Sequence, residues 1–256
     1  MLDAVEGRGV SAGRRISCLV PLVLAGVLVF AGVARILFIF WKDEQRHLVE
    51  LSLKSMGMAL DLYAEDDPEH YFPRISAAPG HLIFRNEQAR DGSRLLPDRI
   101  WPGYLVPPTN HHFVRGEKYK DAASIDMAIA AGSYYYLGYM VTNDDEVRAF
   151  AAAYKEYVSS GTELSEADTR ARGVDLLNGR FSRLRRKLGE SNSNERLIPV
   201  LIEHPEYRDP PGGNVLYLDN HVEFIPYPGK WPMTETTIST LRTLTSATPG
   251  EAPTAR

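Results

Sequence analysis

The stretch that decides the expected fold is the apolar run ISCLVPLVLAGVLVFAGVARILFIFW at residues 16–41, which leads directly into KDEQRHLVELSLKSMGMALDLYAE at residues 42–65. Arg35 is the only charged residue in the apolar run. A helix of this length extends about 39 Å at 1.5 Å per residue, which exceeds the roughly 30 Å of a bilayer core. Residues 16–41 therefore predict one transmembrane helix.

Two other interpretations of this run are less consistent with its length. A cleaved signal peptide has an apolar region of about 7–15 residues, and a buried core helix does not need the polar-free run found at residues 19–34. Arginines precede the run, while the charges that follow it are mixed in sign. This bias predicts a cytoplasmic segment at residues 1–15 and a bacterial inner-membrane protein whose C-terminal domain faces the periplasm or the outside.

Residues 42–65 have the pattern of an amphipathic helix. Apolar side chains recur at spacings of 4, 3, 4 and 3, which places them on one helical face: Val49, Leu53, Met56, Leu60 and Tyr63. Three further apolar residues are expected to widen this stripe: Leu51, Met58 and Leu62. The sequence Asp66-Asp67-Pro68 should end the helix, because proline cannot continue its hydrogen bonding. The two stretches are thus expected to form one long helix whose second half packs on a folded domain.

Beyond residue 68, the pattern alternates between strands and helices. We expect strands at residues 133–141 and 197–202, a helix from its cap at Asn143 to about residue 158, and a short helix at residues 234–244. The clearest feature is a hairpin formed by residues 215–218 and 221–225. Asp219-Asn220 is the expected two-residue turn, because both residue types tolerate positive φ.

The expected hairpin turn also fixes a register. It places Val215 opposite Phe224 and Tyr217 opposite Val222, which gives the hairpin one apolar face. Together these elements predict a single extracytoplasmic α+β domain at residues 42–244. The tail at residues 245–256 has the composition of a disordered segment.

Composition excludes some functions. The formal net charge is −4, whereas a protein that binds nucleic acid needs a basic surface. No nucleic-acid partner is therefore expected. The single cysteine, Cys18, lies in the apolar run, which leaves no thiol nucleophile or thiolate metal site in the domain. Phosphate-binding glycine loops, zinc-protease motifs and nucleophile elbows are missing from the sequence. We therefore expect no catalytic residue, no cofactor and no identifiable small-molecule substrate.

Three groups of residues have the chemistry of binding sites. The histidines His111, His112, His204 and His221 together with Asp219 have ligand chemistry for zinc, but their spacing does not favour a shared site. Asp219-Asn220 offers oxygens for calcium, although a turn is the better interpretation. The basic run at residues 180–187 suits either anionic headgroups or, more simply, a solvated helix face. No metal site is expected.

Several of these stretches resemble a known family. Residues 53–66 with Tyr71-Phe72-Pro73, the aromatic run at residues 134–139, the run at residues 228–234 and the motif GGNVLYLDNHVEF at residues 212–224 are similar to bacterial pseudopilin-like proteins. These are the type II secretion and type IV pilin relatives found in planctomycetes, which carry a prepilin-type processing-associated motif. His204 and Asp219 are the counterparts of the histidine and aspartate of that motif, and Gly212, Gly213, Asn220 and His221 complete the motif and turn.

The resemblance implies an α+β pilin-like fold, in which a long N-terminal transmembrane helix packs on a small antiparallel sheet. It implies a structural or interaction protein whose partners are the lipid bilayer and pilus or secretion-system subunits, or further copies of itself. The prepilin signal is degenerate, because Gly13-Arg14-Arg15 is followed by neither the aromatic residue nor the glutamate of the family. The alternatives are an anchored binding module that does not assemble and a metal-dependent hydrolase.

Overall fold

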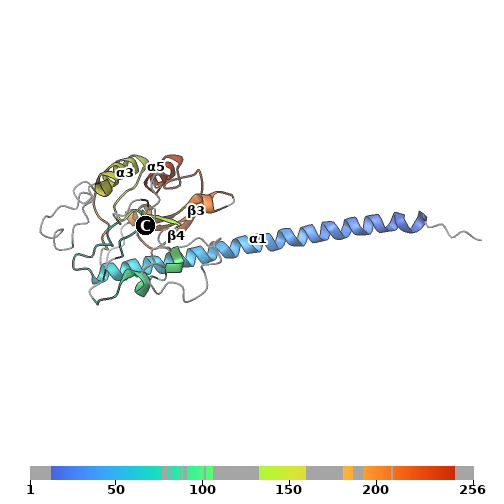
Figure 1. The fold of residues 1–256 in the computed structure, drawn as a ribbon, viewed down its shortest axis with the longest axis horizontal. Helices are drawn as coiled ribbons and strands as arrows, with labels where there is room; N and C mark the ends of the chain where they lie inside the picture. Colours follow the sequence, from blue (N-terminus) through green and yellow to red (C-terminus); the bar gives the residue numbers. More distant parts are fainter. Residues whose placement is uncertain are drawn as a thin grey trace, which may run out of the picture. The chain divides into compact units, whose positions relative to one another are not determined.

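The structure, a computed structural model, describes residues 13–76, 80, 82–86, 88, 91–100, 102–105, 133–159, 181–186, 193–208 and 210–245. The chain divides into two compact units, Met1–His47 and Leu48–Arg256. Its elements are α1 (Gly13–Asp66), η1 (Leu95–Arg99), η2 (Pro102–Leu105), β1 (Tyr134–Tyr136), α3 (Asp144–Ser159), η4 (Ser193–Leu197), β2 (Pro199–Glu203), η5 (Pro205–Tyr207), β3 (Gly212–Tyr217), β4 (Val222–Pro226) and α5 (Glu235–Thr245) (Figure 1). The second unit is an α+β domain with a four-stranded antiparallel sheet.

The predicted transmembrane helix is wrong. No helix among the described residues combines the length and the apolar character that crossing a membrane demands. A crossing needs about 20 predominantly apolar residues. The side chains described in the first part of α1 are those of residues 25–38, which include Arg35, and from Glu50 onward the helix is amphipathic. Three predictions that depended on this helix are therefore also wrong: the pilin-like fold with a membrane span, the inner-membrane location and the single-pass topology.

The C-terminal part of α1 packs into the domain by the predicted stripe. All five stripe residues are buried and belong to the main hydrophobic core: Val49, Leu53, Met56, Leu60 and Tyr63. Burial of each such side chain stabilises the fold by roughly 1.5–3 kcal/mol. The helix ends at Asp66, two residues before Pro68, as expected. The three residues expected to widen the stripe are instead exposed, because they lie on the opposite side of the helix: Leu51, Met58 and Leu62.

The sheet has the order β1-β2-β3-β4, with every neighbouring pair antiparallel. β1 is shorter than predicted, because Gly138 at φ 65° turns the chain after Tyr136. β2 and β3 are buried along their whole length. These two central strands are therefore the middle of the core, in agreement with their apolar sequences.

The predicted hairpin register is wrong by one residue. Phe224 pairs with Asn214, and Val222 pairs with Leu216. The cause is the length of the loop, which contains three residues, 218–220, instead of two. Tyr217 donates its N–H to the carbonyl of His221 at 3.0 Å, and Asn220 closes the loop at φ 65°. A three-residue loop that ends in a left-handed residue is the next most common hairpin connection.

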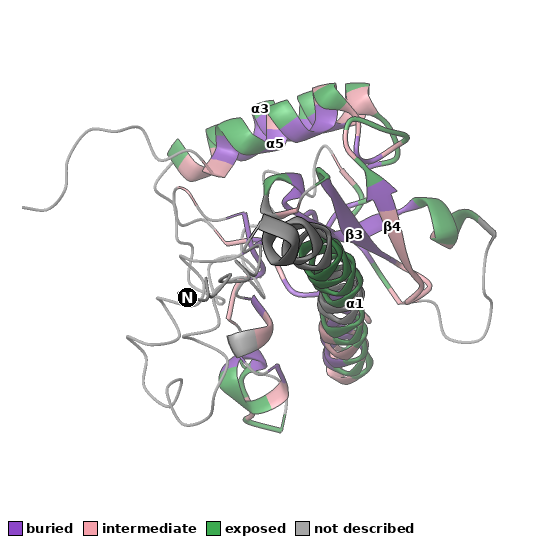
Figure 2. Ribbon diagram, turned by 90° about the vertical axis from the view of Figure 1, so that its right-hand side faces the viewer, coloured by how far each residue is buried: buried purple, intermediate pink, exposed green. Residues whose placement is uncertain are grey.

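α3 and α5 lie side by side on the face of the sheet that is turned away from α1 (Figures 1 and 2). Asn143 caps α3, accepting a hydrogen bond from the N–H of Glu146 at 3.0 Å, as predicted. Asp144 also accepts hydrogen bonds from the hydroxyls of Thr234 and Thr237 at 2.5 and 2.6 Å. The first turns of the two helices are therefore joined, which fixes them as one layer.

Residues 181–186, part of the basic run expected on a helix, are extended. Leu184 exchanges hydrogen bonds with two segments, donating to Gly138 O and accepting from Phe72 N, each at 3.0 Å. The N–H of Arg186 likewise donates to the carbonyl of His70 at 2.9 Å. This segment joins the end of α1 to the chain that leaves β1, a long-range pairing that local periodicity does not reveal. The predicted tail beyond Thr245 lies outside the described residues.

Gly57 determines how closely α1 approaches the β3–β4 hairpin. A Cβ at this position would lie 2.5 Å from Oδ1 of Asn220 and 3.1 Å from a methyl carbon of Leu216. Any side chain here would therefore displace the Asn220 amide and crowd the buried Leu216 side chain. At Gly26, which is also in α1, no other atom of the described residues lies within 4 Å of the corresponding Cβ position, apart from the backbone of the helix itself.

We predict that Gly57→Leu lowers the free energy of unfolding by about 1–3 kcal/mol, because the added volume has no space in a packed interface. The same substitution at Gly26 is the matched control and should cause no loss, since leucine is a better helix former than glycine. Urea denaturation followed by circular dichroism measures both variants. Equal stability of Gly57→Leu and the wild type would show that the hairpin does not pack closely on α1.

Candidate functional site

The β3–β4 turn carries three of the residues singled out from the sequence. Asp219 accepts a hydrogen bond from the backbone N–H of His221 at 3.2 Å and also contacts its ring Nδ1. Arg196 contacts the other carboxylate oxygen at 3.2 Å. Partial burial acts to raise the pKa of Asp219, but the hydrogen bonds from His221 outweigh it and leave the pKa below its ordinary value. The His221 ring stacks on Tyr217 at 4.3 Å, so all of these groups stabilise the turn itself.

The turn is attached to α1 through the partly buried carboxylate of Asp61. The side-chain amide of Asn220 donates to the Asp61 carboxylate, which also receives Arg186 from the extended segment at 3.1 Å. Arg186 contacts Glu65 as well, at 3.2 Å. Burial raises the pKa of Asp61 above its ordinary value, although Asn220 and Arg186 act in the opposite direction. Three segments distant in sequence therefore meet at Asp61.

His204 lies at the opposite end of the sheet from this turn. It follows β2 directly, whereas the register pairs Pro199, at the start of β2, with Tyr217 beside the turn. Its ring packs on Tyr135 at a centroid distance of 4.0 Å. Burial lowers the pKa of His204 from its usual 6.5 to about 4. The structure therefore does not bring His204 and Asp219 together, and the pair matched to the family motif forms no common site.

Gly212 and Gly213 are required by close packing. A Cβ on Gly213 would lie 2.7 Å from the backbone oxygen of Glu203, and one on Gly212 would lie 2.9 Å from the backbone oxygen of Ile225. Beside them, the buried Glu203 carboxylate accepts a hydrogen bond from Arg208 Nε at 3.0 Å and two from Asn214 at 2.8 and 2.9 Å. Burial raises the pKa of Glu203. Arg208 Nη2 donates a further hydrogen bond at 3.3 Å, and with these four hydrogen bonds in place the cluster is a structural anchor for the β2–β3 connection.

The metal-site alternatives find no support in these positions. His111 and His112 lie outside the described residues. Across the described ranges, no three His, Cys, Asp or Glu side chains converge as metal ligands.

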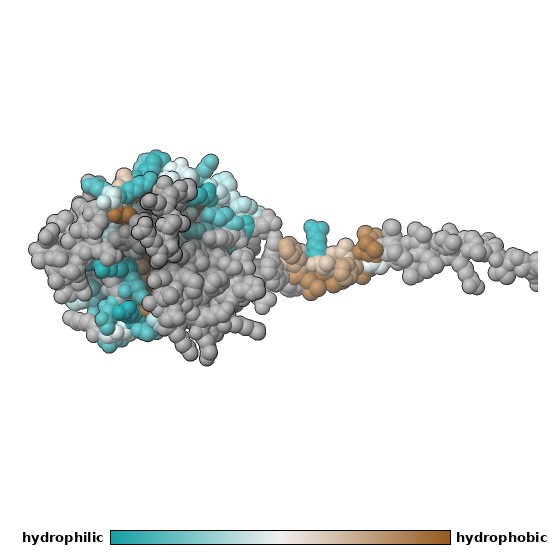
Figure 3. All heavy atoms as spheres, in the orientation of Figure 1, coloured by the Kyte–Doolittle hydropathy of each residue, from teal (hydrophilic) through white to brown (hydrophobic). Residues whose placement is uncertain are grey.

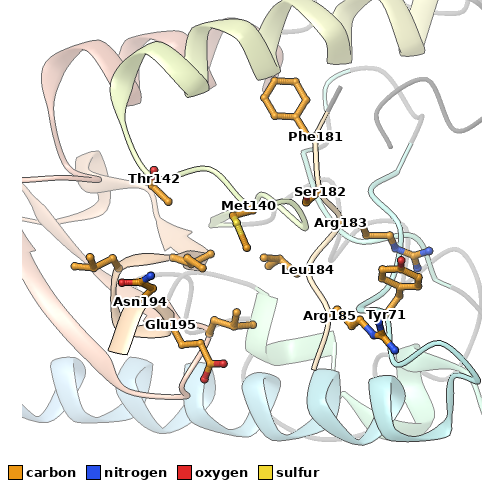
Figure 4. Close-up of a pocket in the computed structure, with 13 residues that line it drawn as sticks. Tyr71, Met140, Thr142, Phe181, Ser182, Arg183, Leu184, Arg185, Asn194 and Glu195 are labelled. Atoms are coloured by element: carbon orange, nitrogen blue, oxygen red, sulfur yellow. The ribbon is translucent and has the colours of Figure 1, made fainter. Parts of the chain in front are cut away.

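A cavity of about 730 Å³ is the feature that sequence reasoning missed. It lies where the extended segment 181–186 passes the chain after β1, the η4–β2 connection and the end of β3 (Figure 4). Its lining is mainly apolar, with two arginines and a tyrosine: Tyr71, Met140, Thr142, Phe181, Ser182, Arg183, Leu184, Arg185, Asn194, Glu195, Leu197, Ile198 and Leu218. The basic run at residues 180–187 is the part of the sequence that could have indicated this cavity. Interpreting it as a solvated helix face gave no reason to expect a binding site there.

The two arginines of this cavity lie at one end, together with Tyr71. Arg183 and Arg185 lie over the ring of Tyr71, at 5.2 and 5.9 Å from its centroid. Figure 4 shows the three side chains together, with Met140 and Leu184 toward the middle of the cavity and Asn194 and Glu195 on its other side. This arrangement, an apolar chamber with a cationic end, is suited to binding and contains no nucleophile with an adjacent base.

Comparison of the chain with models of known protein families, with curated proteins and with solved structures gives no match. The resemblance to pseudopilin-like proteins therefore stays a prediction from the sequence motifs.

The low pKa of His204 leads to a prediction about acid stability. The unfolded chain protonates this histidine below about pH 6.5, whereas the folded chain does so only below about pH 4. The unfolded state therefore binds more protons between these values, and the stability that His204 contributes is lost as the pH falls from 6.5 to 4. The wild type should lose up to about 3 kcal/mol relative to His204→Phe over this range.

Phenylalanine preserves the stacking on Tyr135 and cannot titrate, so the difference between the two proteins isolates the histidine. The raised pKa values of Asp61 and Glu203 have the opposite sign and are common to both proteins, so they cancel. Urea denaturation at intervals from pH 7 to pH 4 gives the two curves. Parallel curves would mean that His204 is as accessible to protons in the folded chain as in the unfolded one.

Proposed function

We propose that this protein is a non-catalytic structural subunit related to pseudopilin-like proteins, which assembles with further copies of itself through α1. The observation that carries the proposal is a seam of exposed apolar side chains along the part of α1 that is turned away from the sheet. In the domain it consists of Leu48, Leu51, Met58 and Leu62, with exposed fractions of 48–60%.

The spacing of the seam is that of a helix–helix interface. Together with Ser55, the four residues recur at intervals of 3, 4, 3 and 4, which is the spacing of the a and d positions of a coiled coil. The same heptad spacing, counted back along the sequence, includes Val27, Phe30 and Leu37, which are also exposed. Figure 3 shows the described part of this N-terminal stretch as mostly hydrophobic surface.

A second copy of the chain is the partner that fits this seam. A contiguous exposed apolar surface of this kind marks an interaction site in most proteins. An identical helix offers the same a/d spacing in return, so the interface is self-complementary without any further element. The sheet already covers the inner stripe of α1, and assembly therefore uses a different face from folding.

The alternative function is a binding module that does not assemble. The cavity beside Tyr71 favours it, because an assembling subunit needs no such chamber. The two functions differ in the oligomeric state of the protein and in the consequence of altering the seam.

We predict that the purified full chain self-associates and that the double variant Leu51→Glu, Met58→Glu weakens association at least about tenfold, equivalent to 1.4 kcal/mol. The reason is that two buried carboxylates would face each other across the seam. Sedimentation equilibrium measures the association constant. The unfolding curve should not change, because both positions are exposed in the single chain.

The matched control introduces two glutamates at exposed positions elsewhere, Ala152→Glu on α3 and Ser239→Glu on α5. It should associate as the wild type does. A monomeric wild type would contradict assembly and favour the binding module. An oligomer that the seam variant leaves intact would place the interface on another surface.

A further inference from the structure

The structure points to a binding site that the proposed function does not use: we propose that the cavity beside Tyr71 binds a small amphipathic carboxylate, with its acid group at Arg183 and Arg185 and its apolar body in the chamber. The volume of about 730 Å³ lies within the range of small-molecule sites. All thirteen lining residues are described, and all belong to the second unit.

The charge of the two arginines indicates an anionic group. The neighbouring Arg186 contacts both Asp61 and Glu65, but neither Arg183 nor Arg185 contacts a carboxylate within the described part of the chain. The guanidinium of Arg183 donates to the carbonyl of Phe72, while its buried Nε has no hydrogen-bond partner among the described residues. The Arg185 side chain is exposed and can be reached by a ligand, and a carboxylate is the group whose geometry matches a guanidinium.

Tyr71 holds the two guanidinium groups in place. Both lie over its ring, an arrangement that orients a cation without neutralising its charge. The backbone pairing of Tyr71 with Arg185 fixes the extended segment from which the arginines project. The cationic end is therefore formed before a ligand arrives, which lowers the entropic cost of binding.

The remaining lining indicates an apolar body. Outside α1, the described ranges contain two large apolar side chains that are exposed, Met140 and Leu197, with exposed fractions of 48% and 58%. Both of them line this cavity. Leu218 and Ile198 extend the same surface. A ligand with an aliphatic or aromatic body would bury this surface, and each Å² of apolar surface removed from water contributes roughly 25 cal/mol to the free energy of binding. Methionine in the lining adapts to bodies of different shape.

Titration of the full chain with 6-phenylhexanoate in a calorimeter tests the proposal. We expect saturable binding of one equivalent. The alcohol 6-phenylhexan-1-ol, which has the same body without the acid, should bind at least about tenfold more weakly, because a hydrogen bond to a charged group is worth about 1.5–3 kcal/mol. The amine 6-phenylhexan-1-amine should bind more weakly than the acid, since two arginines repel it and Glu195 is the single carboxylate among the lining residues.

Variants locate the site. Arg185→Gln should weaken binding of the acid about ten- to a hundredfold, and because Arg185 is exposed the unfolding curve should not change. Leu197→Glu places a carboxylate in the lining and should weaken the acid further than the alcohol. The matched control, Arg148→Gln, removes an exposed arginine of α3 outside the cavity and should leave binding unchanged.

Three results would overturn the proposal. They are no saturable binding of the acid, equal binding of the acid and the alcohol, and acid binding that Arg185→Gln leaves intact. The last would identify adventitious binding to other apolar surface, such as the α1 seam. Because none of these titrations depends on self-association, failure here leaves the assembly proposal standing, and a monomeric wild type leaves this one standing.

Discussion

The packing of the inner stripe of α1 against the sheet is the contact on which the rest of the domain depends. Leu53, Met56 and Leu60 are completely buried in a core that also contains the central strands β2 and β3. The β3–β4 hairpin reaches the helix because Gly57 has no side chain at the point of closest approach. Without that approach, the turn residue Asn220 would not reach Asp61, and the polar connection between helix and hairpin would not form.

Asp61 links α1 to the hairpin and to the extended segment at residues 181–186. Its second partner, Arg186, comes from the extended segment that pairs with residues after α1 and after β1. The same segment presents Arg183 and Arg185 to the cavity beside Tyr71. The two proposed sites therefore use different residues of one framework: the outer seam of α1 is proposed for a second copy, and the chamber at residues 181–186 is proposed for a small ligand.

Local pattern predicted much of this fold and little of the site. The buried stripe of α1, the end of the helix before Pro68 and the Asn143 cap follow from helical periodicity and capping chemistry, which act over a few residues. The transmembrane prediction and the hairpin register failed. The register failed because loop length, two residues or three, is not visible in the turn sequence. The cavity depends on strand pairing across more than a hundred residues, so a basic run read alone suggested a solvated helix.

Because its inner stripe is buried against the sheet, the C-terminal part of α1 should fold and unfold together with the sheet as one cooperative unit. Native-state hydrogen exchange of the full chain tests it most directly, by comparing the amides of residues 53–64 in α1 with those of β3. Both groups of amides should exchange with the same free energy, that of global unfolding. Exchange of the α1 amides at a clearly lower free energy, while β3 stays protected, would contradict it, because the helix would then open without the sheet.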